Sequence, residues 1–142
     1  MLVLLFFTHS DKEWIAGEDG FWYQYYHMES TFAEARGICQ RQGGDLAMEK
    51  SLITHEYIAK TFRGIIWVGI ARKGNTSVFT FVDGSPITKS WWAQGKPDNT
   101  ADNNCVHHWP LQQNTWHDRD CSFKTRFLCQ KSKHFLVVYV ER

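Results

Sequence analysis

Four cysteines constrain the fold of this 142-residue chain most strongly: Cys39, Cys105, Cys121 and Cys129. No two of them form a Cys-x-x-Cys pair, whereas zinc sites usually place two ligands two to four residues apart. Two disulfides are therefore the better interpretation, and disulfides indicate an oxidising compartment. Four cysteines allow three pairings, and their spacing alone does not choose among them.

The composition is that of one globular domain, which we expect to span residues 1–142. Hydrophobic residues make up 43% of the chain and charged residues 22%. Lys and Arg total 16 against 15 Asp and Glu, so the charge gives no basis for nucleic-acid binding. No apolar run reaches the roughly 20 residues that a membrane-spanning helix needs. We expect a core of about residues 21–130 with strand-like extensions at both ends.

These extensions are two short apolar runs. Leu2–Phe7 has no basic flank and no clear small-residue cleavage site, so we favour a strand over a truncated secretory signal. His134–Val140 is also strand-like, and the two ends could pair.

The first half of the chain predicts a strand and two helices. The aromatic run 21–27 is typical of a strand. Ser30 or Thr31 can cap a first helix, with Glu34 at capping-box spacing from Thr31 and Gly43-Gly44 as the stop. A second helix is expected over 51–62. The apolar stripes comprise Phe32, Ala35, Ile38 and Cys39 on the first helix, and Ile53, Tyr57, Ile58 and Phe62 on the second.

The second half predicts strands around one long loop. The expected strands are 65–70, 78–82, 105–109, 115–118 and 125–130. Between them, residues 93–104 are polar and contain Gly95 and Pro97, and long loops in compact domains are often functional. The element order indicates an α+β fold.

Oxygen donors are concentrated in and after this loop: Asp98, Asn99, Asp102, Asn103, Asn104, Asp118 and Asp120. Hard cations such as Ca²⁺ take six to eight oxygen ligands. A solvated polar loop, in which Asn and Asp serve turns, is the alternative interpretation and the more frequent one for such a composition.

Six short segments occur in a specific order. They are Thr31–Cys39 with Gly43–Ala47, Trp67-Val-Gly-Ile70, Phe81-Val-Asp-Gly84, Trp92–Asp98, Trp116-His-Asp118 and Phe127-Leu-Cys129. Together with the four cysteines they resemble the C-type lectin-like domain over roughly residues 21–130. The resemblance implies the disulfides Cys39–Cys129 and Cys105–Cys121, each worth roughly 3–4 kcal/mol by loop-closure arithmetic. It also implies a non-enzymatic recognition module outside the cell.

The resemblance further implies a ligand set for one Ca²⁺, carried over to Lys96, Asp98, Asn103, His117 and Asp118, with the proline after Lys96 in cis. Charged Lys96 has no lone pair, and calcium does not favour the ring nitrogen of His117. Only Asp98 and Asp118 keep the family's carboxylates.

Two alternatives follow for this site. Lys96 can serve as an internal cation between Asp98 and Asp118 in a metal-free site, which we favour, or Ca²⁺ binds with Asp102 as a replacement ligand. The Pro-Asp order resembles the galactose-type loop, which would stack a sugar on an aromatic ring such as Trp91 or Trp109. We expect Trp67, Trp92 and Trp116 to belong to the core.

Two further features carry weaker signals. His107 and His108 alternate on a strand, so at most one of them joins His117, and a zinc site there is a minority interpretation against ordinary histidines. Asn75-Thr-Ser77 is an N-glycosylation sequon.

The function that the sequence favours is carbohydrate binding through the long loop, by a secreted protein or a receptor ectodomain. A calcium-independent domain that binds a protein or another surface is the alternative. The expected partner is a glycan, a glycoprotein or a protein ligand, and a homo-oligomer is compatible with either function.

Overall fold

The computed structural model describes residues 13–110 and 113–133, so the terminal runs Leu2–Phe7 and His134–Val140 lie outside the described residues. The elements in chain order are β1 (Ile15–Ala16), β2 (Phe21–Ser30), α1 (Phe32–Arg41), β3 (Asp45–Leu46), α2 (Leu52–Thr61), β4 (Ile66–Arg72), β5 (Phe79–Phe81), β6 (Cys105–Trp109), β7 (Thr115–Arg119) and β8 (Thr125–Ser132). This order confirms the predicted α+β class. The two-residue strands β1 and β3 were not predicted.

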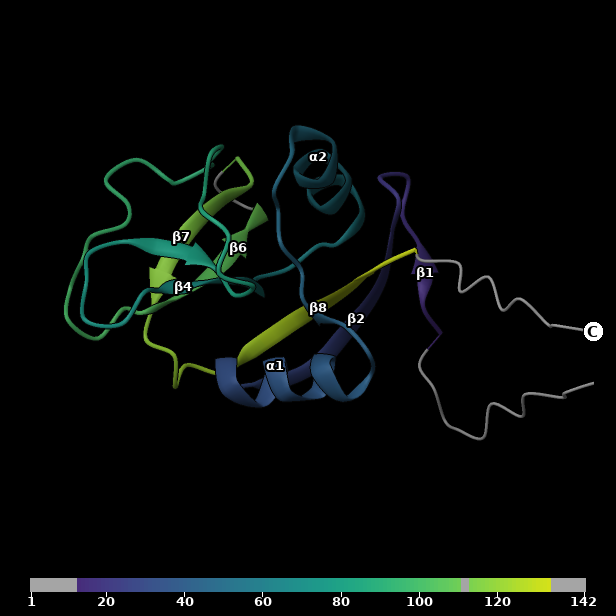
Figure 1. The fold of residues 1–142 in the computed structure, drawn as a ribbon, viewed down its shortest axis with the longest axis horizontal. Helices are drawn as coiled ribbons and strands as arrows, with labels where there is room; N and C mark the ends of the chain where they lie inside the picture. The colour runs from purple at the N-terminus through teal and green to yellow at the C-terminus, as the bar shows by residue number, and fades with distance from the viewer. Residues whose placement is uncertain (1–12, 111–112, 134–142) are drawn as a thin grey trace, which may run out of the picture.

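All the strands of this described part join one sheet. The path is β1-β2-β8-β4-β6-β7, with β3 on β8 and β5 on β4. The β4–β8 pairing is parallel, and the other pairings are antiparallel. The long pair β2–β8 runs between the two helices, and β4, β6 and β7 extend the sheet towards the long loop (Figure 1).

The core has two halves because side chains alternate along β8. Leu128 packs with Tyr57 and Ile58 of α2 in one buried cluster. Phe127 and Cys129 pack with α1 in the other, which also contains Trp67. The predicted core position of Trp67 is therefore confirmed. Both helices contribute one face to an interior that the sheet divides.

The first helix follows its predicted signals. The Oγ1 atom of Thr31, the N-cap, accepts the backbone N–H of Glu34 at 3.2 Å. Phe32, Ala35 and Cys39 are buried. The helix ends before Gly43, whose φ of 87° belongs to the left-handed region that glycine adopts without strain.

The second helix differs from its predicted stripe at one residue. Ser51 is its N-cap, and Tyr57 and Ile58 are buried as expected. Ile53, however, is 65% exposed, so its predicted place on the buried stripe is wrong. The buried positions of that turn belong to Thr54 and His55, because each has a polar partner inside the protein.

Two disulfides join segments distant in the chain. Cys39–Cys129 links α1 to β8 across 90 residues, and Cys105–Cys121 links β6 to the turn after β7. The pairing implied by the resemblance is confirmed. The long loop between β5 and β6 therefore leads into a strand that a covalent bond fixes at its first residue.

A glycine on β4 marks the closest approach of three segments. A Cβ on Gly69 would lie 2.6 Å from the carbonyl oxygen of Leu46 and 3.0 Å from the side chains of Met48 and Val82. The Gly69 amide donates to the carbonyl of Ala47 at 2.7 Å. No side chain fits there without moving the backbone, which accounts for glycine within the Trp67–Ile70 motif.

This packing predicts opposite effects for two alanine substitutions. Gly69→Ala should lower the free energy of unfolding by about 1–3 kcal/mol, as overpacking does. Gly37→Ala should raise it by up to about 1 kcal/mol, because helix propensity increases and its Cβ meets only the flexible end of Arg41. Urea unfolding of the disulfide-bonded protein measures both. Equal effects of the two substitutions on the free energy of unfolding would contradict the close packing of the three segments around Gly69.

Candidate functional site

The structure brings together four of the residues that the sequence predicted for the long-loop site. Lys96 Nζ lies 2.8 Å from Asp98 Oδ2. The backbone N–H of Asp98 donates to Asp118 Oδ1 at 3.1 Å, and Asn103 Nδ2 donates to Asp98 Oδ1 at 3.3 Å. The Lys96-Pro97 peptide bond is cis, as the resemblance implied. Lys96 pairs with Asp98, whereas Asp118 receives the Asp98 amide.

The two carboxylates of this site differ in electrostatic environment. Asp98 Oδ1 also accepts from the N–H and the hydroxyl of Thr100. The Lys96 ammonium and then the Thr100 amide hold the pKa of Asp98 well below its ordinary value. Burial raises the pKa of Asp118, whose Oδ2 has no hydrogen-bond partner among the described residues. Of the two carboxylates, Asp98 therefore holds its negative charge more strongly.

The donor set does not fit an ordinary calcium site. Calcium needs several oxygens with accessible lone pairs. Here the Lys96 ammonium occupies one oxygen of Asp98, and three donors occupy the other. Within the described residues, the buried Asp118 Oδ2 is the one carboxylate oxygen of the pair that remains uncommitted. The side chains and amides of the loop supply the partners of the Asp98 carboxylate without a metal ion.

Arg72, at the end of β4, organises the long loop and was not singled out from the sequence. Its Nε donates to Asn104 Oδ1 at 2.8 Å, and its Nη2 donates to the carbonyl of Asn103 at 3.2 Å. Its guanidinium also lies over the ring of Phe79, 4.7 Å from the centroid. A basic residue at a strand end gives no signal in the sequence for these contacts.

His117 and Trp109 lie beside each other on the β6–β7 hairpin. The His117 ring is 5.6 Å from His107 and 5.2 Å from Trp109 between centroids. His117 Nε2 is 3.1 Å from Thr115 Oγ1, so this nitrogen is directed along β7. Burial lowers the pKa of His107 to about 3 and also lowers that of His117. Both rings are neutral at physiological pH.

The predicted alternation of the two neighbouring histidines is confirmed. His107 is the cross-strand partner of His117, and His108 is the partner of Trp116 on the other face. His108 therefore belongs to a different group of side chains, which is buried beneath α2.

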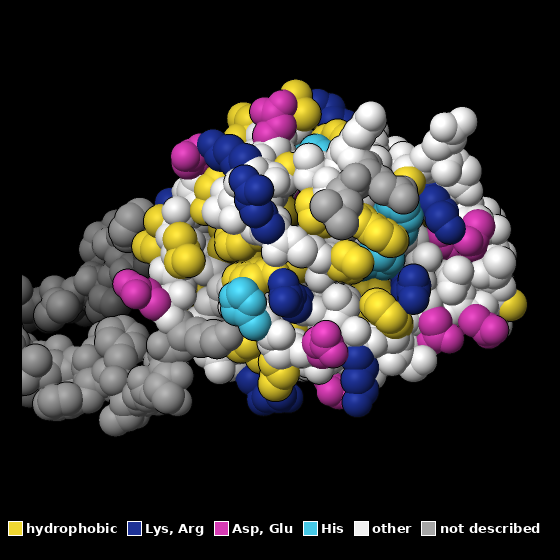
Figure 2. Space-filling view, turned by 180° about the vertical axis from the view of Figure 1, so that it is seen from behind, with side chains coloured by type: hydrophobic (Ala, Val, Ile, Leu, Met, Phe, Trp, Pro, Cys, Tyr) yellow, Lys and Arg dark blue, Asp and Glu magenta, His cyan; other side chains and the backbone are white. Residues whose placement is uncertain are grey.

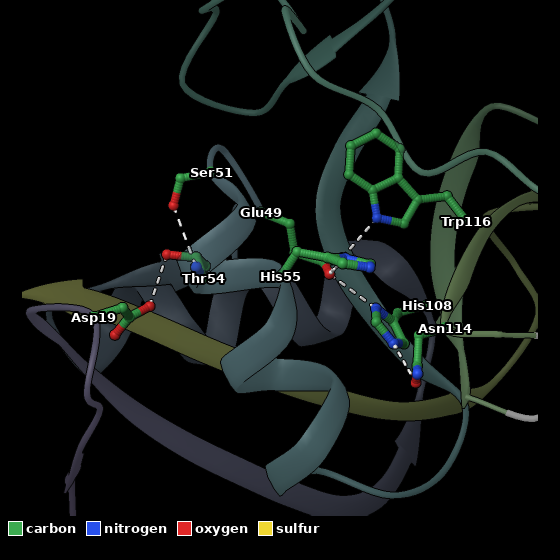
Figure 3. A network of polar contacts seen from close by, with 8 residues as sticks. All are labelled: Asp19, Glu49, Ser51, Thr54, His55, His108, Asn114 and Trp116. Carbon is green, nitrogen blue, oxygen red and sulfur yellow. Dashed lines mark hydrogen bonds and ion pairs between the residues drawn. The ribbon is translucent and has the colours of Figure 1, made fainter.

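That group is built around the carboxylate of Glu49 (Figure 3). Glu49 Oε1 lies 2.7 Å from His55 Nδ1 and 2.9 Å from His108 Nδ1. Trp116 Nε1 donates to Glu49 Oε2 at 2.7 Å. The side chains of Glu49 and His108 are 0% exposed, and that of His55 is 8% exposed. Three donors from α2, β6 and β7 thus converge on one buried carboxylate, which we call the Glu49 cluster.

The imidazole rings of the Glu49 cluster are themselves fixed. His108 Nε2 lies 3.5 Å from Asn114 Oδ1. His55 stacks on Trp91 with 4.1 Å between centroids and an interplanar angle of 4°. Trp91 also packs edge-on against Trp116, so it contributes to the core. Of the two predicted sugar-stacking tryptophans, Trp91 is therefore engaged in core packing, whereas Trp109 lies beside His107 and His117.

The charges within the Glu49 cluster balance. Burial alone would raise the pKa of Glu49, but the charges and hydrogen bonds of His108 and His55 lower it to about 2. Burial alone would lower the pKa of His108, but Glu49 raises it above 6.5. Glu49 and His108 therefore each favour the charged form of the other. His108 was predicted from the sequence but Glu49 and His55 were not, because the three residues come from separate segments.

The remaining sequence features lie on the surface. Asn75 of the sequon is exposed in the turn between β4 and β5. Basic and acidic side chains are interspersed with apolar ones over the face seen in Figure 2, as the near-zero net charge suggests. Within the described ranges, we find no helix of the length and apolar character needed to cross a membrane.

Two helices on either side of a largely antiparallel sheet, two disulfides and a long loop with a cis-proline together define a C-type lectin-like domain. The model of the lectin C-type domain matches residues 28–131, and the chain belongs to this family. Solved structures with this fold include a calcium-independent type II antifreeze protein (TM-score 0.78, 24% identity, 84% of this chain and 91% of that one). They also include the carbohydrate-recognition domain of the mouse scavenger receptor C-type lectin (TM-score 0.77, 23% identity, 85% and 96%).

Relatives by sequence include human C-type lectin domain family 17, member A, which is 30% identical over 75% of this chain. C-type lectin lectoxin-Phi1 of Philodryas olfersii is 30% identical over 70% of this chain and 70% of its own length. The chain spans only 29% of the human relative and 44% of the mouse CD209 antigen-like protein A.

The Glu49–His108 pair predicts a decline in stability above pH 6.5. The raised pKa of His108 means that its contribution is present in full below the unfolded-state value of 6.5 and is lost as the pH rises through the folded-state value. The contribution of Glu49 is present above its unfolded-state value of 4.5 and is lost as the pH falls towards about 2. Urea unfolding in EDTA at a series of pH values measures both the loss of stability above pH 6.5 and the loss below pH 4.5.

Two histidine variants test the assignment of this pH dependence, one at the cluster and one as its control. His108→Gln should flatten the decline above pH 6.5. His27→Gln, at an exposed position on β2, should leave it unchanged. An equally steep decline in the His108 variant would assign the effect to another group.

Proposed function

We propose that this chain is a single extracellular recognition domain that binds carbohydrate through the long-loop surface without requiring calcium. The observation that carries this proposal is the ion pair between Lys96 and Asp98, 2.8 Å apart, at the position where the family's sugar-binding members hold the metal. An ammonium there supplies a positive charge to Asp98, one of the two loop carboxylates. The hydrogen bonds of the loop then hold its shape without a metal ion.

Proteins that share this fold include some titled as calcium-independent and some titled as Ca²⁺-dependent. One similar structure is titled a calcium-independent type II antifreeze protein, and another a Ca²⁺-dependent type II antifreeze protein in its Ca²⁺-free form. The C-type carbohydrate-recognition domain of cow CD23 was solved in the presence of a GlcNAc2Man3 oligosaccharide, and it shares the fold at a TM-score of 0.78. These likenesses bear on the scaffold, so the case for this chain depends on its own loop.

The loop surface offers groups suited to sugar hydroxyls. Lys96 and Asp98 are partly exposed and differ in charge, and the Asn103 amide lies beside them. Paired donors and acceptors with fixed geometry recognise hydroxyl groups. The Trp109 ring, on the neighbouring hairpin, supplies an aromatic surface of the kind that stacks on a sugar. Arg72 holds the loop backbone in place before a ligand arrives.

Binding of a protein or another surface is the second candidate function. Leu52 and Ile53 are adjacent on α2 and exposed at 49% and 65%, which favours an apolar contact. This patch is separate from the long loop, so the two candidates require different surfaces. Extracellular location is supported by the two disulfides and by the exposed Asn75.

Glycan binding in EDTA tests the proposed function. The biotinylated chain, assembled on streptavidin to provide several copies, should bind a subset of immobilised galactose-, mannose- and N-acetylglucosamine-terminated glycans equally in EDTA and in calcium. Asn103→Ala should weaken this binding, because it removes a polar group from the loop surface. Gln40→Ala, on exposed α1 surface, should not. No retention on any glycan would favour the protein-binding candidate. Equal retention by both variants would contradict binding through Asn103 and the long-loop surface.

Substitution of Lys96 tests why calcium is not required. After it is stripped of bound metal ions and freed of the chelator, the wild type should melt at the same temperature with and without millimolar Ca²⁺. Lys96→Glu should melt lower in EDTA, because three acidic groups then meet, and calcium should raise its melting temperature by several degrees. Lys96→Ala, which adds no oxygen, should show no calcium response. A calcium-specific rise in the wild type as large as that in Lys96→Glu would contradict the internal-cation proposal.

A further inference from the structure

The Glu49 cluster has the donor set of a metal site as well as that of a hydrogen-bond network. The Nδ1 atoms of His55 and His108 and one oxygen of Glu49 lie within 4.8 Å of one another. Both nitrogens are directed at the same oxygen, Oε1, at 2.7 and 2.9 Å. Their lone-pair positions therefore converge on one small volume between α2 and β6 (Figure 3).

We propose that His55, His108 and Glu49 form a buried zinc site, distinct from the long-loop site. Two imidazole nitrogens and one carboxylate oxygen are the ligands of many three-residue zinc sites, in which a water completes the tetrahedron. Calcium and magnesium prefer sets made of oxygen alone, so this set discriminates against them. The ligand class is a borderline divalent cation such as Zn²⁺, with Co²⁺ as its spectroscopic substitute.

Both nitrogen–oxygen separations require only a small expansion to admit the ion. Tetrahedral zinc with bonds of about 2.0–2.1 Å places its ligand atoms about 3.3 Å apart. The present nitrogen–oxygen separations of 2.7 and 2.9 Å must therefore widen by roughly half an ångström. In the bound state the zinc replaces the Nδ1 hydrogens, and each ring keeps a hydrogen on Nε2.

Outer contacts already orient each ligand for this role. The Asn114 oxygen faces Nε2 of His108 at 3.5 Å and can accept the hydrogen that a metal-bound ring retains there. Trp116 holds the other carboxylate oxygen at 2.7 Å, which directs Oε1 towards the histidines. Trp91 fixes the plane of the His55 ring by stacking. Metal sites depend on such outer contacts nearly as much as on their ligands.

Zinc titration of the whole chain, stripped with EDTA and freed of the chelator, tests the proposal. Competition with a chromogenic zinc chelator should show one tight equivalent that excess calcium and magnesium do not displace. Co²⁺ should produce visible ligand-field absorption of tetrahedral intensity, and zinc should remove it. Zinc should also raise the melting temperature.

Three histidine variants locate the ion. His55→Asn changes the least buried ligand, so it should fold, and its zinc affinity should fall by at least about tenfold. His27→Asn removes an exposed histidine, and His117→Asn breaks the other histidine pair, His107–His117. Both should keep the wild-type affinity.

Several outcomes would overturn the proposal. They are failure of the wild type to compete for zinc, a Co²⁺ spectrum without tetrahedral intensity, unchanged affinity in His55→Asn, or loss of binding in His117→Asn. With any of these outcomes, the Glu49 cluster would be a hydrogen-bond network only. If His55→Asn does not fold, the wild-type titration and the Co²⁺ spectrum still decide between a zinc site and such a network.

Discussion

The buried carboxylate of Glu49 is the interaction on which the arrangement of α2, β6 and β7 depends. It precedes α2 in the chain, and its donors come from α2 itself and from both strands of the hairpin. Burial of an ion pair costs several kcal/mol of desolvation for each charge, so loss of one partner is far more damaging than loss of an exposed pair. A well-packed apolar set at these positions would often be as stable. Stability alone therefore does not explain why the chain places three polar side chains there.

The β6–β7 hairpin connects this cluster to the long loop. Trp116 and Asp118 are two residues apart on β7, so they share one face of the sheet. Trp116 donates to Glu49, and Asp118 accepts the amide of Asp98 in the loop. The loop segment also pairs directly with β7, because the Ala93 amide donates to the carbonyl of Trp116. The polar site and the buried cluster thus depend on the same strand, whereas His107 and His117 occupy its other face.

Sequence patterns predicted the parts of this protein that depend on neighbours along the chain. The Thr31 cap, the Gly43-Gly44 stop of the first helix and the alternation of His107 and His108 are local effects, and all three agree with the structure. The disulfide pairing and the cis-proline required the family resemblance, because spacing alone left three pairings open. The resemblance also identified Asp98 and Asp118, which meet although 20 residues separate them.

The residues that were misplaced or missed from the sequence have one physical feature in common. Ile53 was placed inside because apolar periodicity carries no information on polar side chains with buried partners. Thr54 and His55 displace it, and the partner of His55 is Glu49, a residue that composition assigns to the surface. Arg72 was missed for the same reason, since its acceptors lie about 30 residues further on. Pairing between polar groups far apart in the chain is the information that a single sequence does not display.

The Lys96–Asp98 pair and the Glu49 cluster differ in their exposure to solvent. Lys96 and Asp98 are partly exposed, and pairs of this kind contribute only about 0–1 kcal/mol. The loop is therefore held mainly by hydrogen bonds from Arg72 and to Asp98. The side chains of the Glu49 cluster are almost closed to solvent, with Glu49 and His108 at 0% exposure and His55 at 8%. The cluster and the polar site are nevertheless joined by one strand, because Trp116, which donates to Glu49, and Asp118, which accepts the Asp98 amide, both lie on β7.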